Sequence, residues 1–318
     1  MLRRFFSLIV VLALAALPVA FAETAVVRVG ALKGPTAMGK VKLMADKADA
    51  YDFTLAAAPD ELVPLLVKGE MDIAAVPANL GSVLYNNTQG AVKALAINTL
   101  GVLYIVERGD TVHSVADLKG RTLVTAGKGS TPEYALNYIL RGNGLDPEAD
   151  LTIEFKSEHA ECLAAMLQDE SIVAMLPQPF ATVAQGEAED MRVALDLTAE
   201  WDALQAGAEA PSAMITGIAV VRAAFAEENP EAVAQFLTDY AESVKFVQED
   251  VEGAAQLIEQ FDIFKAGPAQ KALPFCNIVF IDGEEMKAKL GGYLAALMAQ
   301  DPAAVGGALP GDDFYFVK

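Results

Sequence analysis

Apolar and polar positions change period along the first two thirds of the chain, from short β-like runs to segments with a helical stripe. The first unit has predicted strands at 26–32, 51–58, 71–77 and 92–108, and predicted helices at 36–50, 60–70 and 79–87. The second has predicted strands at 121–127, 151–156, 171–179 and 214–222, a helical turn at 115–120 and helices at 131–144 and 158–170. Such alternation predicts an α/β fold whose sheets are mostly parallel and flanked by helices.

The last third of the chain has a helical pattern. Residues 229–250 carry one apolar stripe, formed by Val233, Phe236, Leu237, Tyr240, Val244 and Val247. This spacing predicts an amphipathic helix. More helix is expected to about residue 300, before a tail that contains glycine and proline and ends in DDFYFVK.

The N-terminus has the pattern of a secretory signal. Two arginines precede an apolar run, and Ala20 and Ala22 have the A-x-A spacing of a cleavage site. We expect cleavage after Ala22, which makes residues 1–22 a signal peptide and the mature protein periplasmic or secreted. A membrane anchor is the alternative, but the unbroken apolar core is shorter than the ~20 residues of a comfortable span.

The net charge and the length of the chain limit which partners and how many lobes the protein can have. The chain has 23 basic and 43 acidic residues, and removal of Arg3 and Arg4 with the signal gives 21 − 43 = −22. Nucleic acid and an anionic bilayer are therefore unlikely partners. A mature chain of about 296 residues exceeds one hydrophobic core, so two lobes are expected.

One β-run leaves the first unit near residue 104 and another returns near residue 216. We therefore assign 23–103 and 216–318 to lobe 1, and 104–215 to lobe 2, with the helical C-terminal segment on lobe 1. A ligand cleft would lie between the lobes, with hinges at the crossings. Two domains joined by one linker are the alternative, but no Pro/Ser/Gly-rich linker is visible.

Two loops share the pattern K-G-x-T, each between a predicted strand and a predicted helix. They are Lys33-Gly34-Pro35-Thr36 and Lys128-Gly129-Ser130-Thr131. The first N–H groups of a helix lack internal partners and lie at its positive end, so such loops can hold a small anion or polar group. Ordinary turn and capping chemistry explains one such loop, whereas for two copies a ligand site is as well supported as capping.

Three further strand ends open helices, at 76–79, 156–159 and 176–180. Their candidate polar groups are Asn79, Ser157 and Gln178. Ligands of open α/β sheets bind outside the carboxyl ends of strands. Tyr104, Tyr134 or Trp201 could cover an apolar part of the ligand, although Trp201 is equally suited to packing.

The chain resembles substrate-binding proteins of bacterial ABC importers, of the nitrate/sulfonate/taurine type. The resemblance rests on the signal, KGPTAMGKVKLM, the AAVPAN turn, LKG–RTLVTAGKGSTPEYALNYIL, LPQPFATVA and NPEAVAQFL, and it covers almost the whole mature chain. It implies a two-lobed periplasmic-binding-protein fold (type II-like), ligand capture by closure, and delivery to an ABC permease in the membrane. The implied ligand-binding residues are Lys33, Gly34, Pro35, Thr36, Ala37, Met38, Pro77, Asn79, Lys128, Gly129, Ser130, Thr131, Ser157, Glu158, Pro177 and Gln178.

The chain departs from sulfonate binders because these loops contain no arginine, which argues against a strongly charged ligand. The two lobes also bear on Cys162 and Cys276, since a bridge between them would oppose closure, and two free buried thiols are favoured. The loops indicate a monomeric protein that captures a small polar or anionic molecule.

Catalytic and metal-binding patterns are missing from the sequence. His113 and His159 lack a metal spacing and are expected at surface or loop positions, with His159 a candidate to reach the cleft. No catalytic residues, metal or cofactor are predicted. The alternatives are an enzyme on the same scaffold, of the pyrimidine-forming or menaquinone-pathway kind, and a ligand-presenting sensor partner.

Overall fold

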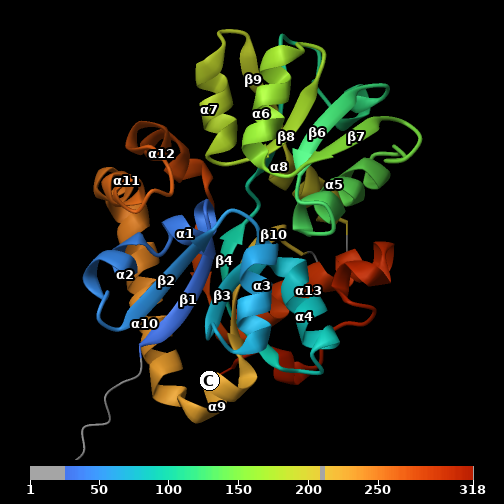
Figure 1. Cartoon of the computed structure of the whole chain (residues 1–318). Helices are drawn as coiled ribbons and strands as arrows, with labels where there is room; N and C mark the ends of the chain where they lie inside the picture. Colours follow the sequence, from blue (N-terminus) through green and yellow to red (C-terminus); the bar gives the residue numbers. More distant parts are fainter. Residues whose placement is uncertain (1–25, 208–211, 318) are drawn as a thin grey trace, which may run out of the picture.

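Two sheets organise the computed structural model, which describes residues 26–207 and 212–317 (Figure 1). The 6-stranded sheet has the order β11-β4-β10-β3-β1-β2. Its strands are β1 (Val27–Leu32), β2 (Tyr51–Ala56), β3 (Ile73–Pro77), β4 (Val92–Leu100), β10 (Ile215–Arg222) and β11 (Ile278–Ile281). We call this sheet and its helices lobe 1.

The 5-stranded sheet has the order β7-β6-β8-β5-β9 and forms lobe 2, at the top of Figure 1. Its strands are β5 (Leu103–Arg108), β6 (Thr122–Ala126), β7 (Thr152–Lys156), β8 (Val173–Pro177) and β9 (Met191–Asp196). The predicted lobe boundaries, 103/104 and 215/216, fall within one residue of the starts of β5 and β10. The division of the chain into lobes at these positions remains an interpretation.

Both sheets contain parallel and antiparallel strand pairs, which corrects the expectation of mostly parallel sheets. The β1–β2, β1–β3, β6–β7 and β6–β8 pairs are parallel. The first strand after each crossing, β5 or β10, runs antiparallel to both of its neighbours. The reason is that β5 and β10 each start at the cleft, where the chain enters the lobe, and lead away from it. The strands β1–β4 and β6–β8 instead end at the cleft.

The predicted strand 92–108 is two strands in different sheets. β4 ends at Leu100 and β5 begins at Leu103. A Cβ on Gly101 would overlap Thr198 Oγ1 and lie 2.6 Å from Met214 Cε. The chain therefore crosses between the lobes at a point where a larger residue does not fit.

Helices cover both sheets. Lobe 1 carries α1 (Pro35–Met38), α2 (Val41–Asp46), α3 (Pro59–Lys68), α4 (Ala78–Asn87), α9 (Ala223–Glu228), α10 (Pro230–Glu249), α11 (Val251–Gln260), α12 (Ala266–Ala272), α13 (Gly283–Gln300) and the short turns η2 (Leu273–Phe275), η3 (Pro302–Val305) and η4 (Asp312–Phe314). Lobe 2 carries η1 (Val115–Leu118), α5 (Thr131–Gly142), α6 (His159–Gln168), α7 (Phe180–Glu187) and α8 (Leu197–Gln205).

The predicted helix 36–50 is broken into α1 and α2 at Gly39 and Lys40. A Cβ on Gly39 would lie 2.9 Å from Ile278 Cγ2 in β11, so the turn packs closely against that strand. Lys40 is fully buried and its Nζ donates to the Thr36 carbonyl at 2.7 Å. These tertiary contacts hold the turn between the two helices.

The predicted amphipathic helix is α10, and its whole apolar stripe is buried in the core of lobe 1. Helix was expected from residue 250 to about residue 300, but β11 adds a strand there because it pairs with β4. The pattern also did not indicate β9, α7, α8 and α9.

Cys162 and Cys276 are free and buried, as favoured from the sequence. Burial raises the pKa of each thiol to about 12. Within the described ranges, no helix combines the length and apolar character needed to cross a membrane. The predicted signal peptide lies outside the described residues.

Candidate functional site in the cleft between the lobes

Six strand ends surround one cavity of about 310 Å³ between the lobes. β1, β2 and β3 approach it from lobe 1, and β6, β7 and β8 approach it from lobe 2. Each of these strands is followed by a helix, so the N-terminal ends of α1, α3, α4, α5, α6 and α7 all lie at the cavity. This arrangement is the one in which open α/β sheets bind ligands.

The structure brings ten of the predicted site residues to the cavity wall: Lys33, Gly34, Pro35, Thr36, Pro77, Ser130, Ser157, Glu158, Pro177 and Gln178. The two K-G-x-T loops therefore face one shared space, although the second loop contributes only Ser130, between the neighbouring Gly127 and Pro132. Gly34 has φ +138°, a conformation that other residues rarely adopt.

The other six predicted residues do not line the cavity. Ala37 and Met38 are fully buried in the core of lobe 1. Lys128 and Gly129 lie outside the lining, and the Lys128 amine sits 5.6 Å from the ring centre of Phe155. The remaining two, Asn79 and Thr131, are buried against each other.

The hydroxyls of both loops have partners within the protein. Thr36 Oγ1 donates to the Leu32 carbonyl at 2.8 Å, and Ser130 Oγ donates to the Gly127 carbonyl at 2.7 Å. Thr131 Oγ1 donates to Asn79 Oδ1 at 3.1 Å, across the two lobes. These side chains therefore brace the loops, and their protons are not directed to the cavity.

Carboxylates occupy three of the helix N-termini. Glu61 accepts from the Ala57 and Ala58 N–H groups at 2.9 and 3.0 Å, at the start of α3. Glu133 accepts from Gly129 N–H at 2.5 Å at α5, and Glu161 accepts from Ser157 N–H at 2.9 Å at α6. Each negative charge offsets part of the positive helix end that faces the cavity.

His159 lines the cavity, which corrects its expected place at the surface or in a loop. It is the first residue of α6, directly after Ser157 and Glu158. Its Nδ1 is enclosed and has no hydrogen-bond partner within residues 26–207 and 212–317, and burial lowers the pKa of the imidazole to about 4. The signal available in the sequence was its position at a strand end, next to two predicted site residues. His113 is exposed in a loop.

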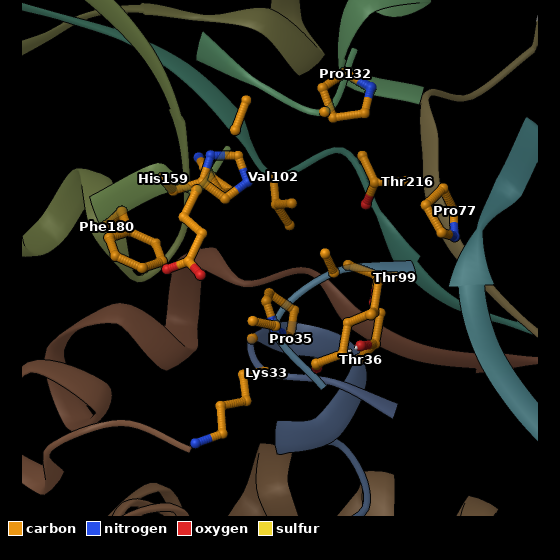
Figure 2. Close-up of a pocket in the computed structure, with 18 of the residues that line it drawn as sticks. Lys33, Pro35, Thr36, Pro77, Thr99, Val102, Pro132, His159, Phe180 and Thr216 are labelled. Atoms are coloured by element: carbon orange, nitrogen blue, oxygen red, sulfur yellow. Dashed lines mark hydrogen bonds between the residues drawn. The ribbon is translucent and has the colours of Figure 1, made fainter. Parts of the chain in front are cut away.

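The aromatic side chains at the cavity are Phe180 and Phe264. Their rings meet edge to face with centroids 5.3 Å apart, and the His159 ring lies 5.7 Å from Phe180. Figure 2 shows His159 and Phe180 on one side of the cavity, with Pro77 and Thr216 on the opposite side.

Tyr104, Tyr134 and Trp201, expected to cover a ligand, do not line the cavity. The Tyr104 hydroxyl donates to the Phe275 carbonyl at 3.2 Å, which joins lobe 2 to lobe 1. Trp201 is fully buried, and its ring centre lies 5.2 Å from that of Tyr293. Tyr104 and Trp201 are buried and contribute to packing, and Tyr134 is half-buried at the edge of the lobe 1 and lobe 2 core.

Several solved structures with a similar fold are named as transport or periplasmic binding proteins. An ABC transporter from Parabacteroides distasonis is 24% identical, with a TM-score of 0.76, and the match covers 92% of this chain and 99% of that one. The periplasmic aliphatic sulphonate binding protein SsuA from Escherichia coli is 17% identical, with a TM-score of 0.72 and 92% of each chain covered. The periplasmic nitrate-binding protein NrtA from Synechocystis PCC 6803 is 14% identical, with a TM-score of 0.59, and 74% of this chain and 66% of that one are covered.

No curated protein matches the chain. A family model described as "ABC transporter, phosphonate, periplasmic substrate-binding protein" matches residues 18–272. The resemblance to importer-binding proteins is thereby confirmed. This chain belongs to the family of periplasmic substrate-binding proteins of ABC transporters that this model describes.

Proposed function

We propose that the protein captures a small polar molecule between its lobes by closure and delivers it to an ABC permease. The observation that carries this proposal is the single cavity formed by strand ends of both sheets. A ligand that contacts both lobes would favour their closed arrangement, since it binds that state more tightly. A monomer, secreted after cleavage behind Ala22, fits this role.

The cavity offers little support for the enzyme alternative. Catalysis by a nucleophile needs a base within hydrogen-bond reach. Across residues 26–207 and 212–317, the histidine at the cavity has no partner for its Nδ1. We therefore propose a binding protein without catalytic residues.

Thermal unfolding with a ligand panel tests the proposal. Taurine, nitrate, methylphosphonate, uracil, nicotinamide and short carboxylates are added in turn, and a bound compound should raise the Tm. X-ray scattering with the compound that gives a shift should then show a smaller radius of gyration than the free protein. An unchanged radius in the presence of bound ligand would contradict closure.

A further inference from the structure

The cavity wall is poor in groups that bind anions. Five of its residues are prolines: Pro35, Pro59, Pro77, Pro132 and Pro177. Pro35, Pro59 and Pro132 occupy the first or second position of α1, α3 and α5. Since proline has no backbone N–H, each of these helix starts has one donor fewer for an anion.

Charged side chains do not compensate for the missing donors. In the described part of the chain, the lysine and carboxylate that line the cavity are Lys33 and Glu158, and no arginine lines it. The Lys33 side chain is 40% exposed, and its amine pairs with Asp262 at 3.4 Å. Figure 2 shows this amine pointing away from Thr99 and Thr216.

The nearby helix starts are capped by acids. Glu61, Glu133 and Glu161 hold N–H groups at the starts of α3, α5 and α6, as described above. An anion in this cavity would lose its hydration without gaining a buried positive partner, which is unfavourable. An uncharged ligand avoids that cost.

The remaining surface suits a flat ring with a polar edge. Phe180 and Phe264 provide aromatic area, and Val102 adds an aliphatic contact. The His159 ring lines the cavity beside that area, and its enclosed Nδ1 has no hydrogen-bond partner among the described residues. A neutral imidazole can donate or accept there, but it supplies no charge.

We infer that the ligand is an uncharged aromatic or heteroaromatic molecule whose polar edge hydrogen-bonds His159, and not a phosphonate, sulfonate or nitrate ion. This inference rests on the proposed function, because it describes the occupant of the same cleft. The inferred ligand differs from the anions that appear in the names of the family and of its structural neighbours.

Matched pairs of ligands, titrated by calorimetry at neutral pH, test the inference. Nicotinamide against nicotinate, benzamide against benzenesulfonate and uracil against orotate each share a ring and differ in charge. At least one neutral member should bind at least about 10-fold more tightly than its anionic partner. No binding by the neutral members, or equal binding of both members, would overturn the inference. Binding of benzenesulfonate or methylphosphonate alone would overturn it while leaving the solute-binding function intact.

Variants identify the polar contact. His159→Phe keeps a ring and removes the nitrogen, and should weaken the best neutral ligand at least about 10-fold. His159→Asn, which restores a donor and an acceptor, should bind more tightly than His159→Phe. His113→Phe, at the exposed histidine, is the matched control and should leave affinity unchanged. Far-ultraviolet circular dichroism checks that each variant is folded. Unchanged affinity in a folded His159→Phe protein would overturn the contact.

Discussion

Thr131 of lobe 2 donates a hydrogen bond of 3.1 Å to Asn79 of lobe 1, and both side chains are fully buried. Asn79 Nδ2 in turn donates to the Ala304 carbonyl at 3.0 Å. The first turns of α4 and α5 are thus joined behind the cavity, and the C-terminal turn η3 is joined to them. Two residues predicted to hold the ligand instead hold the lobes together.

Removal of this bond should destabilise the protein. Thr131→Val keeps the shape of the side chain but leaves Asn79 Oδ1 without its donor in a buried place. The expected loss is about 1–3 kcal/mol in the free energy of unfolding, measured by urea denaturation. Thr238→Val, at an exposed position of α10, is the control. Equal unfolding midpoints for the two variants would show that the contact contributes little.

Gly101→Ala should disturb the crossing between β4 and β5. The added methyl would overlap Thr198 Oγ1 and crowd Met214. Thr198 lies in α8, and Met214 directly precedes β10, with which the chain returns to lobe 1. We expect a lower Tm and weaker ligand binding, since a hinge under strain cannot reach the closed arrangement freely. Gly186→Ala is the control, because a Cβ there would have no atom within 4 Å. A Gly101→Ala protein with unchanged Tm and affinity would contradict the steric argument.

Asp72 should be essential for the stability of lobe 1. Its buried carboxylate accepts from Arg28 at 2.6 and 2.9 Å and from Arg222 at 2.7 Å, and so connects the starts of β1 and β3 to the end of β10. Asp72→Ala removes the buried partner of two arginines that are 40% and 22% exposed, and should cost about 1–3 kcal/mol, measured by urea denaturation. Asp202→Ala, at an exposed carboxylate of α8, should have little effect.

The same carboxylate gives a prediction in acid. Burial raises the pKa of Asp72, but the hydrogen bonds from Arg28 and Arg222 outweigh this and hold the pKa below its ordinary value. The stability it provides is present above the unfolded-state pKa and is lost as pH falls through the folded-state pKa. An Asp72→Asn protein should therefore lose less stability on acidification than the wild type. Parallel losses in both proteins would contradict this assignment.

Lys40 should make the free energy of unfolding depend on pH in the neutral to alkaline range. Burial lowers its pKa to about 7 from an ordinary value of 10.5, and its amine contacts the Thr36 carbonyl and the Tyr240 hydroxyl. The unfolded chain binds this proton more readily between those values, so stability should rise with pH from about 7 by up to about 1.4 kcal/mol per pH unit.

Lys40→Met should remove this slope. Urea denaturation from about pH 7 to about pH 8 measures it as the difference in slope between the wild type and Lys40→Met, in which the contribution of thiol ionisation in the unfolded chain cancels. Lys42→Met, at a half-exposed lysine in the first turn of α2, should keep the wild-type slope. A slope that survives in Lys40→Met would show that another group causes it.

Local pattern predicted much of the fold. The alternation of apolar runs with helical stripes indicated β1–β3, β6 and β7 with the helices that follow them, and also β8. The stripe from Val233 to Val247 indicated α10. These features are encoded by neighbouring residues, because backbone period and turn chemistry are local properties. The same logic placed candidate residues at strand ends, and ten of sixteen lie at the cavity.

The sequence by itself thus determined the α/β class, the order of most of the elements and which loops can reach a cleft. Only the tertiary structure decided that 92–108 divides at Gly101, that β11 pairs with β4, that Asn79 bonds Thr131 and that His159 enters the cavity. Each of these depends on contacts between residues far apart in the chain. A single sequence shows no such contact, because packing and hydrogen bonding between distant segments exist only once the chain has folded.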